Sequence, residues 1–143
     1  MEIVRATKLA QQAGAYYVRI HAMARKHRLT LEEEFDEHDT PDTKYIVAVD
    51  DFLPIATCRL YPCGGNSVML GRIVVLPEYR HQGLGTKVVQ AAEQWARELG
   101  YAKAVVESRD NKVKFYESMG YVGDYSKILT GGSFPCYRME KML

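Results

Sequence analysis

The stretch GRIVVLPEYRHQGLGTKVV, residues 71–89, decides the fold of this chain. Ile73 to Leu76 form a β-branched apolar run, which is typical of a buried strand, and Pro77 ends it. From Leu84 onward the apolar residues follow a helical spacing. We therefore expect a buried strand, a loop that contains glycines, and a helix in direct succession.

The loop between this strand and this helix carries Arg80, Gly83 and Gly85. Glycines at the start of a helix leave backbone N–H groups uncovered, and the helix dipole adds positive potential, so the loop is suited to a phosphate. A P-loop is excluded because no glycine stands five residues before Gly85. A dinucleotide fingerprint is excluded because Val88 stands where its third glycine would be. An ordinary loop with surface glycines is the alternative interpretation.

The remaining pattern, Arg-x-x-Gly-x-Gly after Val-Leu-Pro-Glu-Tyr, resembles the acyl-CoA pyrophosphate loop of the GNAT superfamily of N-acetyltransferases. The resemblance implies acetyl-CoA as the cofactor. The pyrophosphate would sit on backbone amides of the loop, and the pantetheine arm would pair with the strand edge as a pseudo-strand. The residues expected to contact the coenzyme are Ile73, Val74, Val75, Arg80, His81, Gln82, Gly83, Leu84, Gly85, Thr86, Asn111 and Tyr116.

A second motif, KFYESMGY over residues 114–121, resembles the family segment in which a tyrosine sits beside the coenzyme sulfur. A phenol with its ordinary pKa of about 10 is a proton donor at neutral pH and can protonate a departing thiolate. We therefore expect Tyr116 to be the general acid. The alternative is an ordinary core tyrosine in a helix.

Length and composition limit the class of protein. The chain has 143 residues, 47% hydrophobic and 26% charged, which indicates one globular domain over residues 1–143. A net charge of +1 without a basic stripe argues against nucleic acid as a partner. No apolar run approaches the length of a membrane span, and no signal peptide is visible, so we expect a cytoplasmic protein without a membrane partner. The odd number of cysteines, without Cys-x-x-Cys spacing, suits a reduced compartment and predicts no metal site.

The pattern along the chain predicts strands over residues 2–7, 44–49, 53–61, a stretch through 75, 103–107, 121–129 and 133–142. Helices are expected over 8–27, 84–99 and 110–119. This order predicts an α/β (α+β) fold with a mixed, mostly antiparallel central sheet of about seven strands and helices on both faces. The same order resembles the GNAT acyl-CoA N-acyltransferase fold. The first helix is expected to bury a stripe of Leu9, Ala13, Tyr16, Tyr17, Ile20, Met23 and Ala24.

Residues 17–19 and 33–39 resemble the small bacterial ElaA-like branch of the superfamily. Related glyphosate-type acetyltransferases place arginines at positions that match Arg19 and Arg109, where they hold an anionic substrate. The alternative is that both arginines pair with scaffold carboxylates such as Asp36 or Asp39. The acidic stretch lacks the spacing of a calcium loop, so it is interpreted as a solvated turn or a wall for a cationic amine. The residues assigned to the acceptor side are Arg19, Asp36, Arg72, Arg109 and Cys136.

The general base is an open question in the sequence. Members of this branch often carry a Pro-His pair before the last strand, but this chain has Pro135-Cys136. Three options stay open: Cys136 as a thiolate, a base elsewhere such as Glu107, or a water chain. We favour the last two because a thiol with a reference pKa near 8.5 is a poor neutral base. His21, Met23 and His27 lie on the first expected helix, where they are given no role.

The resemblance implies an acetyl-CoA-dependent N-acetyltransferase that acts on a primary amine of a small molecule or peptide by direct attack. A non-catalytic acyl-CoA-binding module is the alternative, because the usual histidine is replaced by Cys136. A third option is a structural domain that keeps only the fold. The resemblance also allows a homodimer.

Overall fold

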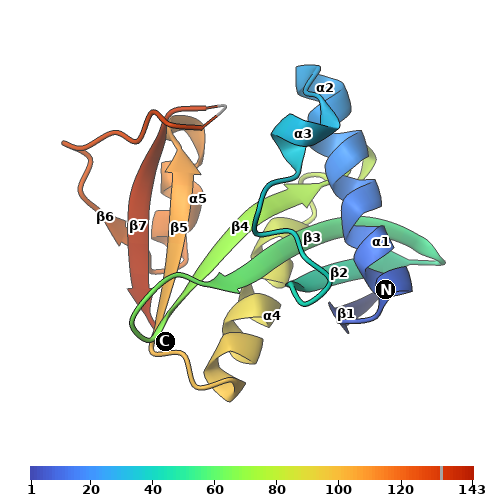
Figure 1. The fold of residues 1–143 in the computed structure, drawn as a ribbon, viewed down its shortest axis with the longest axis horizontal. Coiled ribbons are helices and arrows are strands. Elements are labelled where there is room, and N and C mark those ends of the chain that lie inside the picture. The colour runs from blue at the N-terminus through green and yellow to red at the C-terminus, as the bar shows by residue number, and fades with distance from the viewer. Residues whose placement is uncertain (133) are drawn as a thin grey trace.

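A computed structural model describes residues 1–132 and 134–143 of the chain. It contains a seven-stranded sheet with the order β1-β2-β3-β4-β5-β7-β6 (Figure 1). Neighbouring strands are antiparallel except for β4 and β5, which are parallel. The predicted mixed, mostly antiparallel sheet of about seven strands is confirmed.

The strands are β1 (Glu2–Ala6), β2 (Lys44–Asp50), β3 (Leu53–Pro62), β4 (Ser67–Val75), β5 (Lys103–Arg109), β6 (Val122–Gly123) and β7 (Cys136–Met142). The α-helices are α1 (Leu9–Arg19), α2 (Arg25–His27), α3 (Leu31–Glu34), α4 (Leu84–Glu98) and α5 (Val113–Ser118). A π-helical segment, η1 (Ile20–Ala24), joins α1 to α2, and two 3-10 turns, η2 (Pro77–Tyr79) and η3 (Asp110–Lys112), precede α4 and α5.

The helices form two layers on opposite faces of the sheet. Figure 1 shows α1 and α2 in front of the sheet and α4 behind it. Helix α1 approaches the strands closely at Gly14, where an added Cβ would lie 3.2 Å from Pro54 and 3.5 Å from Val47. Helix α4 turns Val88, Ala92 and Ala96 into the main hydrophobic core, each with no exposed surface. Both layers therefore hold the central strands by close packing.

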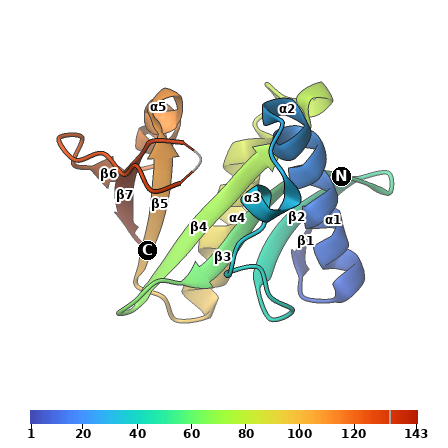
Figure 2. The same cartoon turned by 45° about the horizontal axis from the view of Figure 1, so that its top comes forward.

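The pairing between β4 and β5 stops halfway along β4. Ser67–Leu70 pair with Lys103–Val106, and no pair follows beyond them among the described residues. The interruption coincides with a bulge in β4, where Arg59 pairs with Gly71 but Thr57 pairs with Val74. Arg72 stands in this bulge with a left-handed φ of 48°, which is uncommon for a residue with a side chain. A bulge bends its strand, so β4 leaves β5 from this point, as Figure 2 shows.

Three expectations about elements need correction. The first helix is not one regular α-helix over 8–27, because a π-helical segment interrupts it. Its buried face carries Gln12, Ala15, Val18, Arg19 and Ala22. Of the predicted apolar stripe, Ala24 is buried and Tyr16 packs against the core, but Leu9, Ala13 and Tyr17 are exposed, so the prediction is wrong at those three positions. A polar face was buried because Gln12 donates to two backbone carbonyls and Arg19 meets carboxylates.

The expected strand over 121–129 is reduced to Val122–Gly123 and an isolated bridge between Leu129 and Cys136. Ser126 donates to the Asp124 carboxylate from both its backbone and its hydroxyl, and this local turn ends the strand. The strand expected over 133–142 begins at Cys136, and its predicted first residue lies outside the described residues. No helix in the described part of the chain is long and apolar enough to cross a membrane.

Candidate functional site

The open edge of β4, residues 71–75, runs directly into the glycine loop. Its exposed amides and carbonyls face the side from which β5 has departed, because β3 covers the other side through Ala56 and Thr57. Ile73, Val74 and Val75 are all half-buried. An extended chain can pair with such an edge as an additional strand. The structure thus has backbone N–H and C=O groups available for hydrogen bonds at the strand edge where we expect the pantetheine arm.

The glycine loop leads into α4 with uncovered backbone. Gly83 is the N-cap of α4 in the left-handed conformation, with φ 76°, and no side chain caps the helix. An added Cβ at Gly83 would meet nothing within 4 Å, so the space beside it is open. His81 also has a positive φ of 64°, which is rare for a residue with a side chain. The first N–H groups of a 15-residue helix therefore point into open space, where they can bind an anion.

The other residues expected near the coenzyme have different surroundings. Leu84 is buried in the core, so only its backbone is available to a ligand. Arg80 donates from Nε to the Val75 carbonyl oxygen at 3.4 Å, which keeps its side chain beside the end of β4. Asn111 is exposed in η3, at the carboxyl end of β5.

Helix α5 places Tyr116 beside this loop. Its neighbour Phe115 lies 3.5 Å from where a Cβ of Gly85 would be, so α5 and the start of α4 are in contact. Tyr116 is 8% exposed, and its hydroxyl makes no hydrogen bond within residues 1–132 and 134–143. Burial, with smaller contributions from Cys58 and Cys136, raises the pKa of Tyr116 well above its usual value of 10. Tyr116 therefore keeps its proton at neutral pH and has it available for a ligand.

Residues at the carboxyl end of β5 share one face of the sheet. Arg109 is paired with Cys136 across β5 and β7, and Glu107 lies two residues earlier on the same face. The Arg109 guanidinium lies over the ring of Phe134, 4.1 Å from its centroid. Burial and the charge of Glu107 raise the pKa of the Cys136 thiol, against the opposing charges of Arg109 and Arg72. Cys136 is thus a protonated thiol at neutral pH, and its Sγ lies 3.5 Å from the Phe134 carbonyl oxygen.

A buried cluster of arginines and carboxylates lies in front of the sheet and is called here the arginine–carboxylate cluster. Its members are Arg19, Glu34, Asp36, Asp39, Arg59 and Arg72. Arg19 donates from Nη1 to Asp39 Oδ1 at 2.6 Å and from Nε to Glu34 Oε2 at 3.1 Å. Arg59 donates from Nη1 to Asp36 Oδ1 at 2.8 Å. The cluster joins α1 and the segment after α3 to β3 and β4.

The arginines of the cluster lower the pKa values of two of its carboxylates, Asp36 and Asp39. Burial opposes the charge on Asp39, but the hydrogen bond and charge of Arg19 outweigh it and hold the pKa of Asp39 well below its usual value. Asp36 shows the same direction, with burial outweighed by Arg59. One polar atom is left over: Arg59 Nε is buried without a hydrogen-bond partner among the described residues.

This geometry changes the acceptor-side assignments. Arg19 has no exposed surface, and its guanidinium is occupied by Glu34 and Asp39, so it is not positioned to hold an acceptor. The alternative interpretation, a scaffold ion pair with Asp39, is confirmed for Arg19. Asp36 and Arg72 keep 27% and 31% of their side chains exposed while paired with each other at 3.3 Å. Sequence reasoning missed Arg59, although an arginine between two apolar residues of a strand was a signal for a buried charge.

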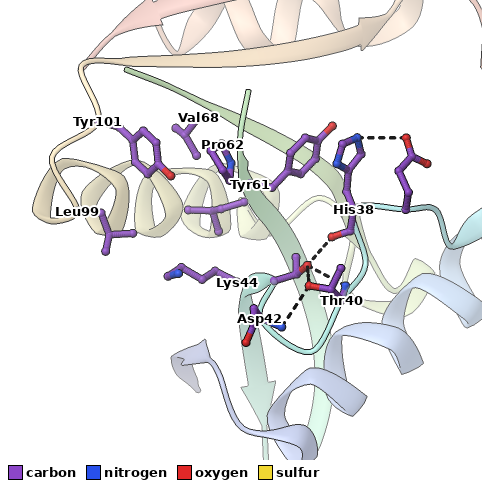
Figure 3. A pocket seen from close by; sticks show the side chains of 12 residues that line it. His38, Thr40, Asp42, Lys44, Tyr61, Pro62, Val68, Leu99 and Tyr101 are labelled. Atoms are coloured by element: carbon purple, nitrogen blue, oxygen red, sulfur yellow. Dashed lines mark hydrogen bonds and ion pairs between the residues drawn. The ribbon is translucent and has the colours of Figure 1, made fainter. Parts of the chain in front are cut away.

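A separate hollow of about 280 Å³ lies at the opposite end of β4. Its walls include His38, stacked on Tyr61 with ring centroids 3.8 Å apart, and Leu99 and Tyr101 beyond α4 (Figure 3). Val68, near the amino end of β4, lines it, whereas the glycine loop follows the carboxyl end. The hollow is therefore not part of the open-edge site.

Comparison with known proteins identifies the family of this chain. The model of the acetyltransferase (GNAT) family matches residues 7–121. An uncharacterized acetyltransferase of Streptococcus pyogenes is 31% identical over 113 residues, covering 79% of this chain and 77% of its own. The crystal structure of a putative N-acetyltransferase from Lactobacillus plantarum has a TM-score of 0.91 at 29% identity, covering 99% and 97% of the two chains.

More distant structures share the fold. Escherichia coli ElaA has a TM-score of 0.79 at 14% identity, covering 98% of this chain and 97% of its own. An N-acetyltransferase from Thermoplasma acidophilum, solved in complex with coenzyme A, has a TM-score of 0.71 at 17% identity over the full length of both chains. The family match over most of the sequence, on a fold with an open strand edge above a glycine loop, shows that this chain belongs to the GNAT family of acetyltransferases.

Proposed function

We propose that the protein transfers an acetyl group from acetyl-CoA to a primary amine of a small molecule or peptide. The observation that carries this proposal is the juxtaposition of three features: the open edge of β4, the start of α4 without a side-chain cap among the described residues, and the Tyr116 hydroxyl. Each could supply the hydrogen bonds that one part of an acyl thioester coenzyme requires. The coenzyme A complex of a distant relative supports the same choice of ligand.

The residues divide the work of such a reaction. The amides of 81–86 would hold the pyrophosphate, and the helix dipole of α4 would favour its charge. The edge at Ile73 and Val75 would align the pantetheine arm, and a backbone N–H there would polarise the thioester carbonyl. Acetyl-CoA supplies the acetyl group as an activated thioester. Tyr116, which is protonated at neutral pH, would then donate its proton to the departing sulfur.

Arg109 is the residue that would select the acceptor. Its guanidinium lies on the front face of β5 and forms no ion pair among the described residues. A planar guanidinium binds a carboxylate or phosphonate through two parallel hydrogen bonds. An acceptor that carries an anionic group beside its amine would therefore fit here. Arg109→Ala should raise the KM of that acceptor by about tenfold or more, as expected for a charged hydrogen bond.

The test is release of free coenzyme thiol from acetyl-CoA in a screen of amino acids, polyamines, aminoglycosides and peptide N-termini. Turnover with at least one amine supports an enzyme, and coenzyme binding without turnover supports the alternative of an acyl-CoA-binding module. Gly83→Asp places a carboxylate and a strained left-handed residue at the pyrophosphate site. We expect at least a tenfold loss of coenzyme affinity by calorimetry, and an unchanged affinity would reject the loop as the site.

A further inference from the structure

We propose that His27 is the base that accepts the proton of the acceptor's ammonium group. This inference rests on the proposed acetyl transfer. It identifies a general base in a chain that has Cys136 where related proteins have the histidine of a Pro-His pair. His27 is the last residue of α2, and its side chain is half-buried. Among residues 1–132 and 134–143, no hydrogen bond to the His27 imidazole contributes to its pKa.

The contacts of His27 place it across from β5. Its ring lies 5.1 Å from the ring of Phe134, in an edge-on arrangement, and Phe134 comes two residues before β7. The same Phe134 ring carries the Arg109 guanidinium, 4.1 Å from its centroid. His27 therefore reaches from the helix layer to the carboxyl end of β5, where Cys136 is paired with Arg109. Figure 2 shows α2 and the segment before β7 on the two sides of the diverging strands β4 and β5.

The helix that carries His27 is built irregularly. The π-helical segment Ile20–Ala24 comes directly before α2 and adds residues to its turns relative to an α-helix. Such insertions rotate the following residues around the helix axis, and they recur at functional sites. Arg28 then ends the helix with a left-handed φ of 55°. The position of the imidazole is thus set by two departures from regular helical geometry on either side of α2.

The charges that act on the pKa of this imidazole belong to side chains of several elements. Arg109 comes from β5, Arg80 from the loop before α4, Lys26 from its own helix and Glu34 from α3. Burial comes first in lowering the pKa of His27 below 6.5, the three cations lower it further, and Glu34 opposes them. At neutral pH the ring is therefore uncharged and can accept a proton. Cys136 cannot compete for this role as a protonated thiol.

The reaction then balances as follows. A proton of the R–NH₃⁺ group passes to the His27 imidazole, and the free amine nitrogen attacks the thioester carbonyl carbon. The C–N bond forms while the C–S bond breaks, the amide nitrogen gives up its second proton to water, and the thiolate takes the Tyr116 proton. The imidazolium and the phenolate return to their starting states by exchange with bulk water.

The test compares His27→Gln with two matched variants, His21→Gln on the same helix and Glu107→Gln on the same face as Arg109. We expect His27→Gln to lower kcat about 10²–10⁴-fold at pH 7, as for the loss of a general base. The loss should shrink as the pH rises toward the pKa of the amine, which then deprotonates in solution. The acid limb of kcat/KM, with a midpoint below 6.5 in the wild type, should disappear in this variant alone.

A readout that does not depend on turnover is the NMR titration of the histidine rings. His27 should titrate below 6.5, and the addition of coenzyme A should shift its resonances more than those of His21. Wild-type kcat and an intact acid limb in His27→Gln would overturn the assignment, and loss of that limb in Glu107→Gln would give the role to Glu107. Absence of thiol release by the wild-type enzyme with every amine would reject the proposed function itself, a result distinct from either.

Discussion

The open-edge site and the arginine–carboxylate cluster meet at Arg72 of β4, but the polar groups of the cluster are paired with one another and those of the open edge are mostly not. In the cluster, the carboxylates Glu34, Asp36 and Asp39 are each paired with an arginine. At the open edge, the backbone of residues 71–75, the start of α4 and the Tyr116 hydroxyl lack such ion pairs among the described residues, and one contact there is the hydrogen bond from Arg80 Nε to the Val75 carbonyl oxygen. Charge alone therefore did not identify the site, because the most heavily charged part of the molecule is its scaffold.

Tyr116→Phe tests the unpaired side of this comparison and should have the largest effect. Removal of a general acid lowers kcat by about 10²–10⁴-fold, while coenzyme affinity measured by calorimetry should change little. Folding stability should also change little, because the hydroxyl has no partner within the described residues. Tyr121→Phe is the matched control: it removes the 2.7 Å hydrogen bond from Tyr121 to Glu93, so it should lower stability and spare kcat. Wild-type turnover in Tyr116→Phe would end the assignment.

Arg19→Met tests the paired side. It leaves Glu34 and Asp39 without their buried cation, and breaking such a pair costs about 3–5 kcal/mol of unfolding free energy. Urea unfolding at pH 7 measures the loss. Arg5→Met is the control, because the Arg5–Glu98 pair is exposed on both sides and its removal should leave the urea midpoint nearly unchanged. Equal midpoints for the two variants would show that the cluster does not stabilise the fold.

Acid should weaken the cluster before it affects the open edge. Asp36 and Asp39 have pKa values below their unfolded value of 3.8, so their contribution to stability is fully present well above pH 3.8. That contribution is lost as the pH falls from about 4 toward their folded pKa values. The urea midpoint should drop over this window in the wild type and less steeply in Arg19→Met, where the largest contribution that lowers the pKa of Asp39 is removed. Parallel pH profiles in both proteins would contradict the linkage.

Cys136→Ala should have the smallest effect. The thiol is protonated at neutral pH and lies beside the site without an ionised partner, so its removal should keep kcat within about twofold and leave the pH–rate profile unchanged in shape. Cys136→His should leave the acid limb in place, because an added imidazole with a pKa near 6.5 is protonated before His27 as the pH falls. A near-total loss of kcat in Cys136→Ala, with coenzyme still bound, would make the thiol catalytic.

The loop and helix start of the proposed coenzyme site could be predicted from sequence because their geometry is local. Gly83 and Gly85 determine the backbone of the loop that follows β4 directly, and the start of a helix presents the same N–H groups whatever its side chains. Tyr116 stands at a fixed distance from Gly120, which ends its helix with a φ of 97°. No distant residue was needed to place either group.

The acceptor side was not readable in the same way because its partners are distant in sequence. Arg19 meets Asp39 across 20 residues, and Arg72 meets Glu34 across 38. A buried arginine on a helix breaks the apolar period that predicts the core face, which is why the predicted stripe included the exposed residues Leu9, Ala13 and Tyr17. The contact of His27 with Phe134 depends on a π-helical segment that the local sequence pattern did not predict.

Beyond the bulge at Arg72, β4 and β5 no longer pair, so each has an unpaired edge in the middle of the sheet. The strands β1–β4 and the strands β5–β7 are joined by the ladder from Ser67–Leu70 to Lys103–Val106. A molecule that pairs with residues 71–75 would link the two groups of strands. Its binding should therefore be measurable as a loss of motion in this part of the sheet. The amides of this segment should exchange with deuterium fastest in the empty protein. A ligand at 100 times its Kd should add about 2.7 kcal/mol to the free energy of unfolding.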